Sequence, residues 1–173
     1  KLSDHGYGPE DFELRLLESY PRREFIVQLH ESHLSFIRRL AEHHGISFFF
    51  EHEHGRDKIV FTDVGGGFGE IDGAFQLPFR PRGEALGVYE LGVEEDLVPT
   101  TFVVQDYNHR TPRVDLTALF PPDGQVAGGV IEYGSHVKTP EESLQLARIR
   151  YEEAHSRQRV YSGKSSEITL SAG

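Results

Sequence analysis

The alternation of apolar and polar residues predicts two strands near the start of the chain. Residues 12–17 alternate loosely, and residues 24–29 alternate more clearly, with Phe25, Val27 and Leu29 on one side. A period of two is typical of a strand, because successive side chains point to opposite faces of a sheet. We therefore expect a strand at each of these places.

A helix is predicted over about residues 32–44. Ser32 stands at its N-cap, and Gly45 occupies the position where a left-handed residue commonly ends a helix. Apolar residues recur between them at helical spacing, and we expect the larger ones to be core. These core positions are Leu34, Ile37 and Leu40, and Ala41 completes the stripe.

A hairpin over residues 46–62 follows, with Gly55 in its turn. Three consecutive phenylalanines, Phe48–Phe50, put aromatic bulk on both faces of its first strand. A sheet with one face in water would not carry them, so we expect both faces to be covered. The cover is either another part of this chain or a second subunit.

Residues 64–84 are rich in glycine and proline and lack helical periodicity. We interpret them as a connecting loop between two parts of the chain, residues 1–63 and 85–173. The glycine cluster at residues 65–69 lacks the Lys-Ser/Thr ending of a phosphate-binding loop, and Asp72 stands where the third glycine of GxGxxG belongs. A flexible connection is the better interpretation of this cluster.

The second part is predicted to contain several strands. They are expected at residues 85–93, 101–107 and 130–133, with an irregular stretch at residues 108–129. A further strand and turn is expected over residues 167–173. Both parts together predict an α+β fold that is mainly β, with two principal packed helices.

The second helix is predicted over about residues 140–160. Thr139 suits the N-cap, Pro140 suits the first helical position, and Glu142 completes a capping box. The apolar positions that continue along one face are Leu144, Ala147, Tyr151 and Ala154.

Charge and composition exclude several classes of function. The 28 acidic and 18 basic residues give a net charge of −10, which opposes binding to nucleic acid or to an anionic membrane surface. The longest apolar runs, such as residues 46–50, are too short to span a bilayer, so we expect no stable membrane insertion by this segment. The absence of cysteine excludes disulfides and thiolate metal sites. Because the chain starts at Lys1 and lacks methionine, we interpret it as a piece of a longer protein.

No pattern of residues predicts catalysis. The sequence has ten histidines but no HExxH, and His30 precedes the first helix, so it shares no helical face with His33. The GxSxG motif of hydrolases is absent as well. We expect no catalytic residue, no cofactor site and no metal site. The alternatives are a metal-dependent hydrolase that uses the histidines, and adventitious metal at His52 and His54 in the hairpin turn.

Residues 21–61 carry short motifs in a fixed order, namely Arg23-Glu24-Phe25, Gln28 to Ser32, Phe36 to Leu40, Glu42 to Ile46, and Phe50-Glu51-His52. This order resembles the VgrG family of type VI secretion spike proteins. Residues 106–108 with Pro112 agree with a later family element more weakly. The family usually has acidic or similar residues where His33, His43 and His44 stand, and these are changes of a surface type.

The resemblance implies the hub at the base of a trimeric puncturing spike, which joins a tube to the spike for effector delivery. It implies barrel-like phage tail hub domains. Residues 1–63, with the helix at 32–44 and the hairpin at 46–62, would be part of the first domain, and residues 85–173 would be the second. An OB-fold and a β-helical needle are expected downstream and are absent from these 173 residues.

The resemblance also implies the partners and the location. The partners are further copies of the chain in a homotrimer, an Hcp-like tube protein and spike-associated effectors, with no nucleic acid. Assembly in the bacterial cytoplasm and then translocation into a target cell are expected. A baseplate hub of a contractile phage tail or tailocin is an alternative within the same class of machinery.

Overall fold

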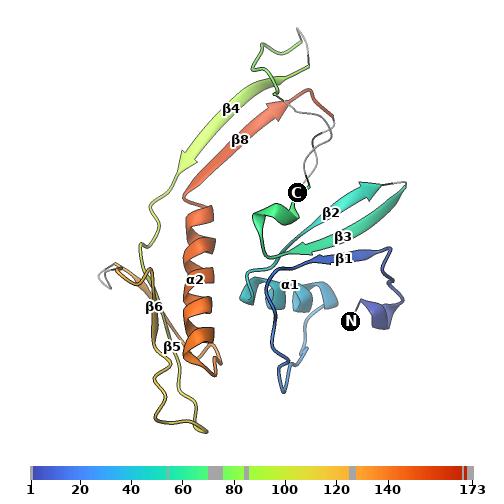
Figure 1. Cartoon of the computed structure of the whole chain (residues 1–173). Helices are drawn as coiled ribbons and strands as arrows, with labels where there is room; N and C mark the ends of the chain where they lie inside the picture. The colour runs from blue at the N-terminus through green and yellow to red at the C-terminus, as the bar shows by residue number, and fades with distance from the viewer. Residues whose placement is uncertain are drawn as a thin grey trace. The chain divides into compact units, whose positions relative to one another are not determined.

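The computed structural model describes residues 2–53, 55–69, 76–83, 86–124, 128–168 and 170. The chain folds into two compact units, one made of Lys1–Val88 with Ser165–Gly173 and the other of Tyr89–Lys164. Sheets predominate, and each unit contains one principal helix (Figure 1). The expected mixed fold, mainly β with two principal helices, is therefore confirmed. Within the described residues the strands form three separate sheets.

A three-stranded sheet forms the centre of the first unit. Strand β1 (Phe12–Arg15) pairs in parallel with β3 (Arg56–Thr62), and β3 pairs antiparallel with β2 (Ser47–Glu53). The strand expected at residues 12–17 and the hairpin expected at residues 46–62 are thus confirmed. Strand β1, which pairs in parallel with the hairpin, lies far earlier in the chain. The local sequence pattern does not reveal this pairing.

The two faces of this sheet are covered to different extents. Phe48 and Phe61 lie side by side on one face, with 5.7 Å between their ring centroids. Phe49 points to the other face and is buried against Phe68, with 5.2 Å between centroids. Phe50 is 45% exposed. Within this chain, the expected cover is present for Phe49 and incomplete for Phe50.

The glycines after β3 form a short 3-10 turn, η2 (Gly65–Gly67), that packs closely on the sheet. A Cβ atom at Gly67 would lie 1.8 Å from Oγ1 of Thr62, so only glycine fits there. Arg15 Nη1 also donates a hydrogen bond to the carbonyl of Gly67 at 3.1 Å. The interpretation as a flexible connection is therefore wrong for Gly67, which is buried. Residues 70–75 and residue 84 of the expected loop lie outside the described residues.

Helix α1 (His33–His43) has the predicted ends. The hydroxyl of Ser32 accepts a hydrogen bond from the backbone N–H three residues later, at 3.1 Å. Gly45 has a φ of 68°, and the next amide, of Ile46, donates to the carbonyl of Ala41 at 2.8 Å. This bond closes the last turn as a left-handed glycine allows. Both end signals are confirmed.

The buried side of α1 differs in part from the predicted one. Phe36 and Ala41 are buried, Ile37 and Leu40 are half-buried, and Leu34 is 55% exposed. The prediction of a core position is therefore wrong for Leu34. Helical periodicity identifies the apolar side of a helix but not which turns have a neighbour, and Leu34 lies in the first turn.

The helix leaves space over the sheet. An apolar hollow of about 520 Å³ lies between α1 and strands β1 and β3. Ile37 and Leu40 line it from the helix, and Phe12, Leu14 and Phe61 line it from the sheet. The first unit is thus incompletely packed in the part of the chain that the structure describes.

The second unit has a second three-stranded sheet. Its central strand β5 (Phe102–Gln105) pairs antiparallel with β6 (Ala118–Phe120) and in parallel with β7 (Val130–Tyr133). The strands expected at residues 101–107 and 130–133 are confirmed. Strand β6 corrects the expectation of an irregular stretch at 108–129. It is only three residues long, and the antiparallel neighbour that makes it a strand is distant in sequence.

Helix α2 (Pro140–Ser156) packs on β5 and β6 and closes the core of the second unit. Thr139 Oγ1 accepts a hydrogen bond from the amide of Glu142 at 3.2 Å, and the Glu142 carboxylate accepts one from the amide of Lys138 at 2.8 Å. The N-terminal signal is therefore confirmed. The buried core consists of Val104, Leu116, Val137, Leu146 and Ala147.

Two details of α2 were predicted wrongly. Leu144, expected on the apolar face, is 45% exposed, whereas Ser143 and Leu146 are buried. The helix also ends at Ser156, four residues before the predicted end, because the chain turns there to enter another strand. Pairing with a distant strand therefore sets this end.

That strand, β8 (Arg159–Ser165), pairs with β4 (Val88–Glu95) in a two-stranded ribbon. Strand β4 starts and ends later than the predicted strand at residues 85–93, of which residue 85 lies outside the described part. The strand and turn expected at residues 167–173 is not present in residues 167, 168 and 170, and the remaining positions are not described. In the described residues, no helix is both long and apolar enough to cross a membrane.

The buried face of α2 differs from the predicted face, and this difference can be tested directly. Leu146→Ala removes a side chain that is 3% exposed in the core, so it should lower the free energy of unfolding by about 2–5 kcal/mol. Leu144→Ala, on the same helix, is the matched control and should cost about 0.5 kcal/mol or less. Urea unfolding followed by circular dichroism measures both. An equal loss in the free energy of unfolding for the two variants would contradict the burial of Leu146 and the exposure of Leu144.

An ion-pair network on the first sheet gives a second test. The carboxylate of Glu13 accepts hydrogen bonds from Arg15 at 2.9 Å and from Lys58 at 2.8 Å. First the Arg15 bond and then the Lys58 bond lower the pKa of Glu13 from 4.5 to about 2. A lowered carboxyl pKa stabilises the folded state above the unfolded pKa, and this contribution is lost as pH falls.

We therefore expect stability to fall with pH between about 4.5 and 2 partly because of Glu13. The Glu13 side chain is 37% exposed, so solvent screens the pair and the effect is modest. Glu13→Gln should make the urea midpoint depend less steeply on pH over this window. Wild-type and variant profiles that run parallel there would contradict a role for Glu13.

Candidate assembly surface

The segment of residues 24–29 lies before α1 and belongs to no strand. The prediction of a strand there is wrong for the chain by itself. Residues 25–29 make no backbone–backbone hydrogen bond with any described residue. A strand needs such a partner, and hydrophobic alternation alone does not supply one. The segment therefore has the side-chain pattern of a strand without its pairing.

Apolar side chains of this segment are exposed in succession. Phe25 is 81% exposed and Leu29 is 69% exposed, and Ile26 and Val27 are 46% and 43% exposed. Single exposed apolar residues are ordinary, but a contiguous group of this kind marks an interaction site. We call residues 25–29 the apolar segment.

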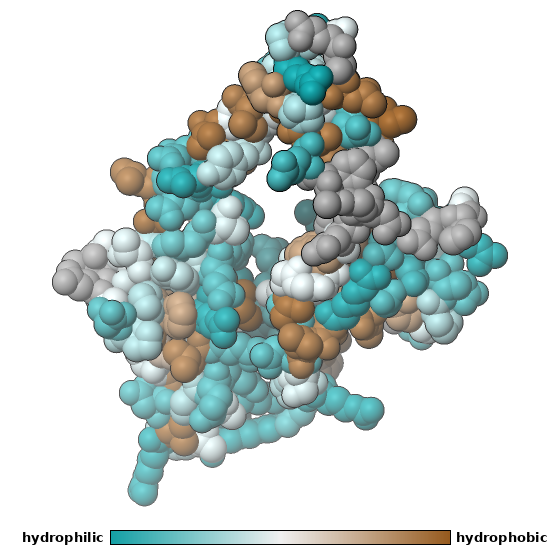
Figure 2. Space-filling view, turned by 45° about the horizontal axis from the view of Figure 1, so that its top comes forward, coloured by the Kyte–Doolittle hydropathy of each residue, from teal (hydrophilic) through white to brown (hydrophobic). Residues whose placement is uncertain are grey.

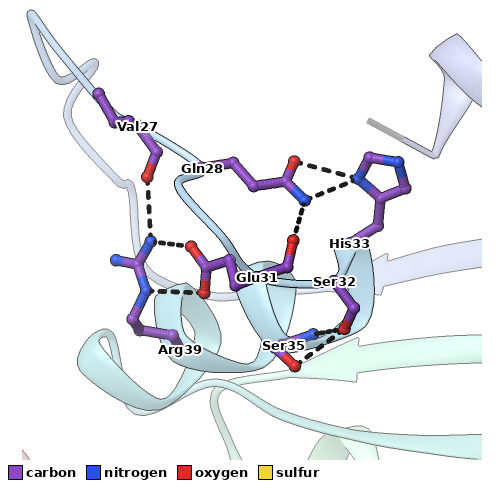
Figure 3. Close-up of polar contacts among 7 residues, drawn as sticks. All are labelled: Val27, Gln28, Glu31, Ser32, His33, Ser35 and Arg39. Atoms are coloured by element: carbon purple, nitrogen blue, oxygen red, sulfur yellow. Dashed lines mark hydrogen bonds and ion pairs between the residues drawn. The ribbon is translucent and has the colours of Figure 1, made fainter.

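Arg39 of α1 fixes one side of the apolar segment (Figure 3). Its guanidinium donates two hydrogen bonds to the carboxylate of Glu31, at 2.7 and 3.3 Å. The same Nη2 donates to the carbonyl of Val27 at 3.2 Å. This bidentate geometry suits the planar fork of arginine. The Arg39 hydrogen bond also lowers the pKa of Glu31, so the carboxylate stays ionised at more acidic pH than an isolated glutamate does.

Gln28 fixes the other side. Its Nε2 donates to the carbonyl of Glu31 at 2.9 Å, and its amide also contacts Nδ1 of His33 (Figure 3). Between them His30 has a φ of 52°, a left-handed conformation that is uncommon outside glycine. A sharp turn at His30 thus leads the backbone from the apolar segment into Ser32, the N-cap of α1.

These contacts explain the motif Gln28-x-x-Glu31-Ser32 together with Arg39. The polar residues bind backbone and one another, whereas the apolar side chains between them are left exposed. The arrangement can hold a recognition surface in place. The sequence identified these residues as a motif, but it did not show that Arg39 contacts Glu31 and Val27. The eight-residue separation of Glu31 and Arg39 is not a helical spacing and gives no signal by itself.

The histidines that the structure describes lie at several separate places. His52 contacts Asp57 at 2.6 Å, His43 accepts a contact from Arg23 at 2.9 Å, and the rings of His43 and His44 are 5.1 Å apart. Within the described residues, no group of three or more potential ligands could hold a metal ion. His54, named above as an adventitious ligand, lies outside the described residues.

The described residues thus form a sheet-rich fold with two principal helices and an exposed apolar segment. The chain belongs to the phage tail baseplate hub (GPD) family, whose model matches residues 1–173.

Relatives include several type VI secretion proteins. The spike protein VgrG1a of Pseudomonas aeruginosa is 26% identical over 152 residues, which are 84% of this chain and 24% of that protein. VgrG1b of the same organism is 26% identical over 157 residues, 87% of this chain and 21% of that protein. The resemblance to the VgrG family inferred from residues 21–61 is confirmed. The chain spans about a quarter of the length of these relatives.

A third relative bears a different name. The actin cross-linking toxin VgrG1 of Vibrio cholerae is 37% identical over 57 residues, which are 33% of this chain and 5% of that protein. The similarity thus concerns a small part of the toxin.

The role of Arg39 can be tested without removing its charge. Arg39→Lys loses the fork that binds Glu31 and the bond to Val27, so the backbone of residues 25–31 should open more often. We expect several-fold faster amide hydrogen exchange in peptides that cover these residues. Arg38→Lys, at the adjacent exposed position, is the control and should leave exchange unchanged. Equal exchange in both variants would contradict the assignment.

Proposed function

We propose that this chain is part of the structural hub at the base of a type VI secretion spike, where three copies assemble and join the spike to a tube. The observation that carries the proposal is the family match over residues 1–173, supported by VgrG relatives that cover most of the chain. The exposed apolar segment supports it as well. A hub that joins other proteins needs surfaces of this kind.

The domain division belongs to this proposal. Residues 1–63 would be part of the first hub domain and residues 85–173 the second, joined through residues 64–84. Barrel-like closure would come from strands supplied by neighbouring parts of the assembly. The open sheets and the apolar hollow beside α1 support this, because small sheets with free edges are marginal alone.

The partners and location follow from the same role. An Hcp-like tube protein would contact the hub, effectors would travel with the spike, and the OB-fold and β-helical needle would continue from it. Assembly in the bacterial cytoplasm would precede translocation into a target cell. The chain would need no catalytic residue, cofactor or metal for this work, and any enzymatic activity would belong to other segments.

A baseplate hub of a contractile phage tail or tailocin is the second candidate, favoured by the description of the matching family. Neighbouring genes separate the two. Tail fibre and lysis genes favour the phage tail, and a secretion ATPase with a membrane complex favours type VI secretion.

Association of the full-length protein tests the hub proposal. Light scattering at micromolar concentration should give the mass of a trimer. Phe25→Ser removes the aromatic side chain of the apolar segment, which is 81% exposed, and it should raise the concentration needed for assembly by about tenfold or more. Tyr7→Ser, at an aromatic residue that is 53% exposed in the same unit, is the control and should have little effect. A monomeric wild-type protein would refute the proposal.

A further inference from the structure

Two histidine contacts tie the apolar segment to α1. Just before the segment, Nη2 of Arg23 lies 2.9 Å from Nε2 of His43, the last residue of the helix. Near the end of the segment, the side-chain amide of Gln28 lies 2.9 Å (Nε2) and 3.0 Å (Oε1) from Nδ1 of His33, the first residue of the helix. The two contacts differ in how they respond to a proton.

The contact between Arg23 and His43 requires an uncharged histidine. A guanidinium carries hydrogen-bond donors only, so Nε2 of His43 must accept the bond and the ring proton must lie on Nδ1. Protonation places a second proton on Nε2, which leaves two donors and two positive charges face to face. Both residues are half-buried, so salt screens this repulsion less than it does between exposed groups. A protonated His43 therefore cannot keep the contact.

The contact between Gln28 and His33 suits either charge state. Nε2 of Gln28 can donate to Nδ1 of a neutral His33 at 2.9 Å, and Nδ1 of a protonated His33 can donate to Oε1 at 3.0 Å. His5 of the short 3-10 turn η1 (Ser3–His5) also faces His33, with 4.5 Å between the ring centroids. Because the glutamine amide adapts to either state, His33 is a matched control for His43.

Further titratable and charged groups stand near His43. His44 faces it, with 5.1 Å between the ring centroids, and Tyr20 faces His44 at 5.2 Å. Two arginines and two glutamates lie beside Arg23 or His43 in sequence or one helical turn away, and their formal charges cancel. These four residues are Arg22, Glu24, Arg39 and Glu42. The direct contact with Arg23 therefore decides the effect of a proton on His43.

We propose that the contact of Arg23 with His43 is a pH-sensitive clamp on the apolar segment, closed at neutral pH and open in acid. Histidine changes its charge between about pH 5 and 8, and the last turn of a helix favours the protonated form. Opening frees the backbone just before Phe25, whereas Arg39 still holds the carbonyl of Val27. The segment then loses part of its order, and a partner that binds it must restore that order at a cost in entropy.

The clamp goes beyond the hub proposal, because the order of the segment can be measured in any state of assembly. The readout must be local, since apolar side chains are exposed elsewhere as well. On the ribbon of β4 and β8, Leu91 is 61% and Tyr161 is 62% exposed, and Figure 2 shows brown, hydrophobic atoms on the surface along this ribbon. A change in association with pH therefore does not by itself report on the apolar segment.

A nitroxide label on a single cysteine gives a local readout in the full-length protein. Residues 1–173 contain no cysteine, and any cysteine outside them is replaced by serine. Ile26→Cys places the label inside the apolar segment, and Arg38→Cys places it at an exposed position of α1 as the control. Between about pH 7.5 and 5.5, electron paramagnetic resonance should show the mobile fraction at residue 26 rising about threefold or more. The label at residue 38 should not change.

Three variants in the Ile26→Cys background identify the sensor. His43→Gln keeps a hydrogen-bond acceptor that gains no charge, so it should abolish the rise. Arg23→Gln should abolish it as well, because a glutamine tolerates a protonated histidine. His33→Gln should keep the rise seen with the wild-type histidines. Circular dichroism at both pH values checks that each variant is folded.

Constant mobility at residue 26 in the protein with all its histidines would overturn the inference. A rise that persists in His43→Gln would do the same, and so would a rise that is lost only in His33→Gln. If the label at residue 38 also became mobile, acid would be unfolding the unit and the clamp would be refuted. The mass measured by light scattering tests the hub proposal separately, so either proposal can fail while the other stands.

Discussion

The guanidinium of Arg39 joins parts of the first unit that no sheet connects. It binds Glu31 with two hydrogen bonds and also holds the carbonyl of Val27. The backbone before α1 therefore has a defined path although it belongs to no strand. The geometry depends on a planar fork that reaches a carboxylate and a carbonyl at once, which a lysine cannot reproduce. The position of the apolar segment follows from this contact.

An exposed apolar group has a different meaning when its backbone is fixed. A loose loop must lose conformational entropy when it binds, and this weakens association. The apolar segment is already tied to α1 by Arg39 and Gln28, so less ordering remains for a partner to impose. Its exposed Phe25 and Leu29 then resemble a surface prepared for contact. This property suits a component that must assemble with other chains.

The same reasoning applies to the sheets. Each unit has a small helix-covered sheet, and the ribbon of β4 and β8 has exposed apolar residues with opposite charge on its two strands. Stable sheets usually need three or more strands with a covered face. Within the described residues, the outer strands of these sheets therefore lack a partner strand over most of their length, and some apolar faces are incompletely covered.

Much of the local structure could be predicted from the sequence. Ser32, Gly45, Thr139 and Glu142 specify helix ends through short-range hydrogen bonds, so their signals were sufficient. The hairpin of β2 and β3 was predictable for the same reason. The motifs in residues 21–61 also identified the family, because they preserve residues such as Gln28 and Glu31 in a fixed order.

Only the tertiary structure decided which strand patterns become strands and which apolar positions are buried. Residues 24–29 alternate like a strand but belong to no strand among the described residues, whereas β6 and β8 become strands because β5 and β4 lie beside them. Leu34 and Leu144 fit a helical stripe and are still exposed. Periodicity is a property of one segment, but pairing and burial depend on neighbours distant in sequence. The partnership of Arg39 with Glu31 and Val27 is likewise a tertiary fact, since it requires the left-handed turn at His30 to bring them together.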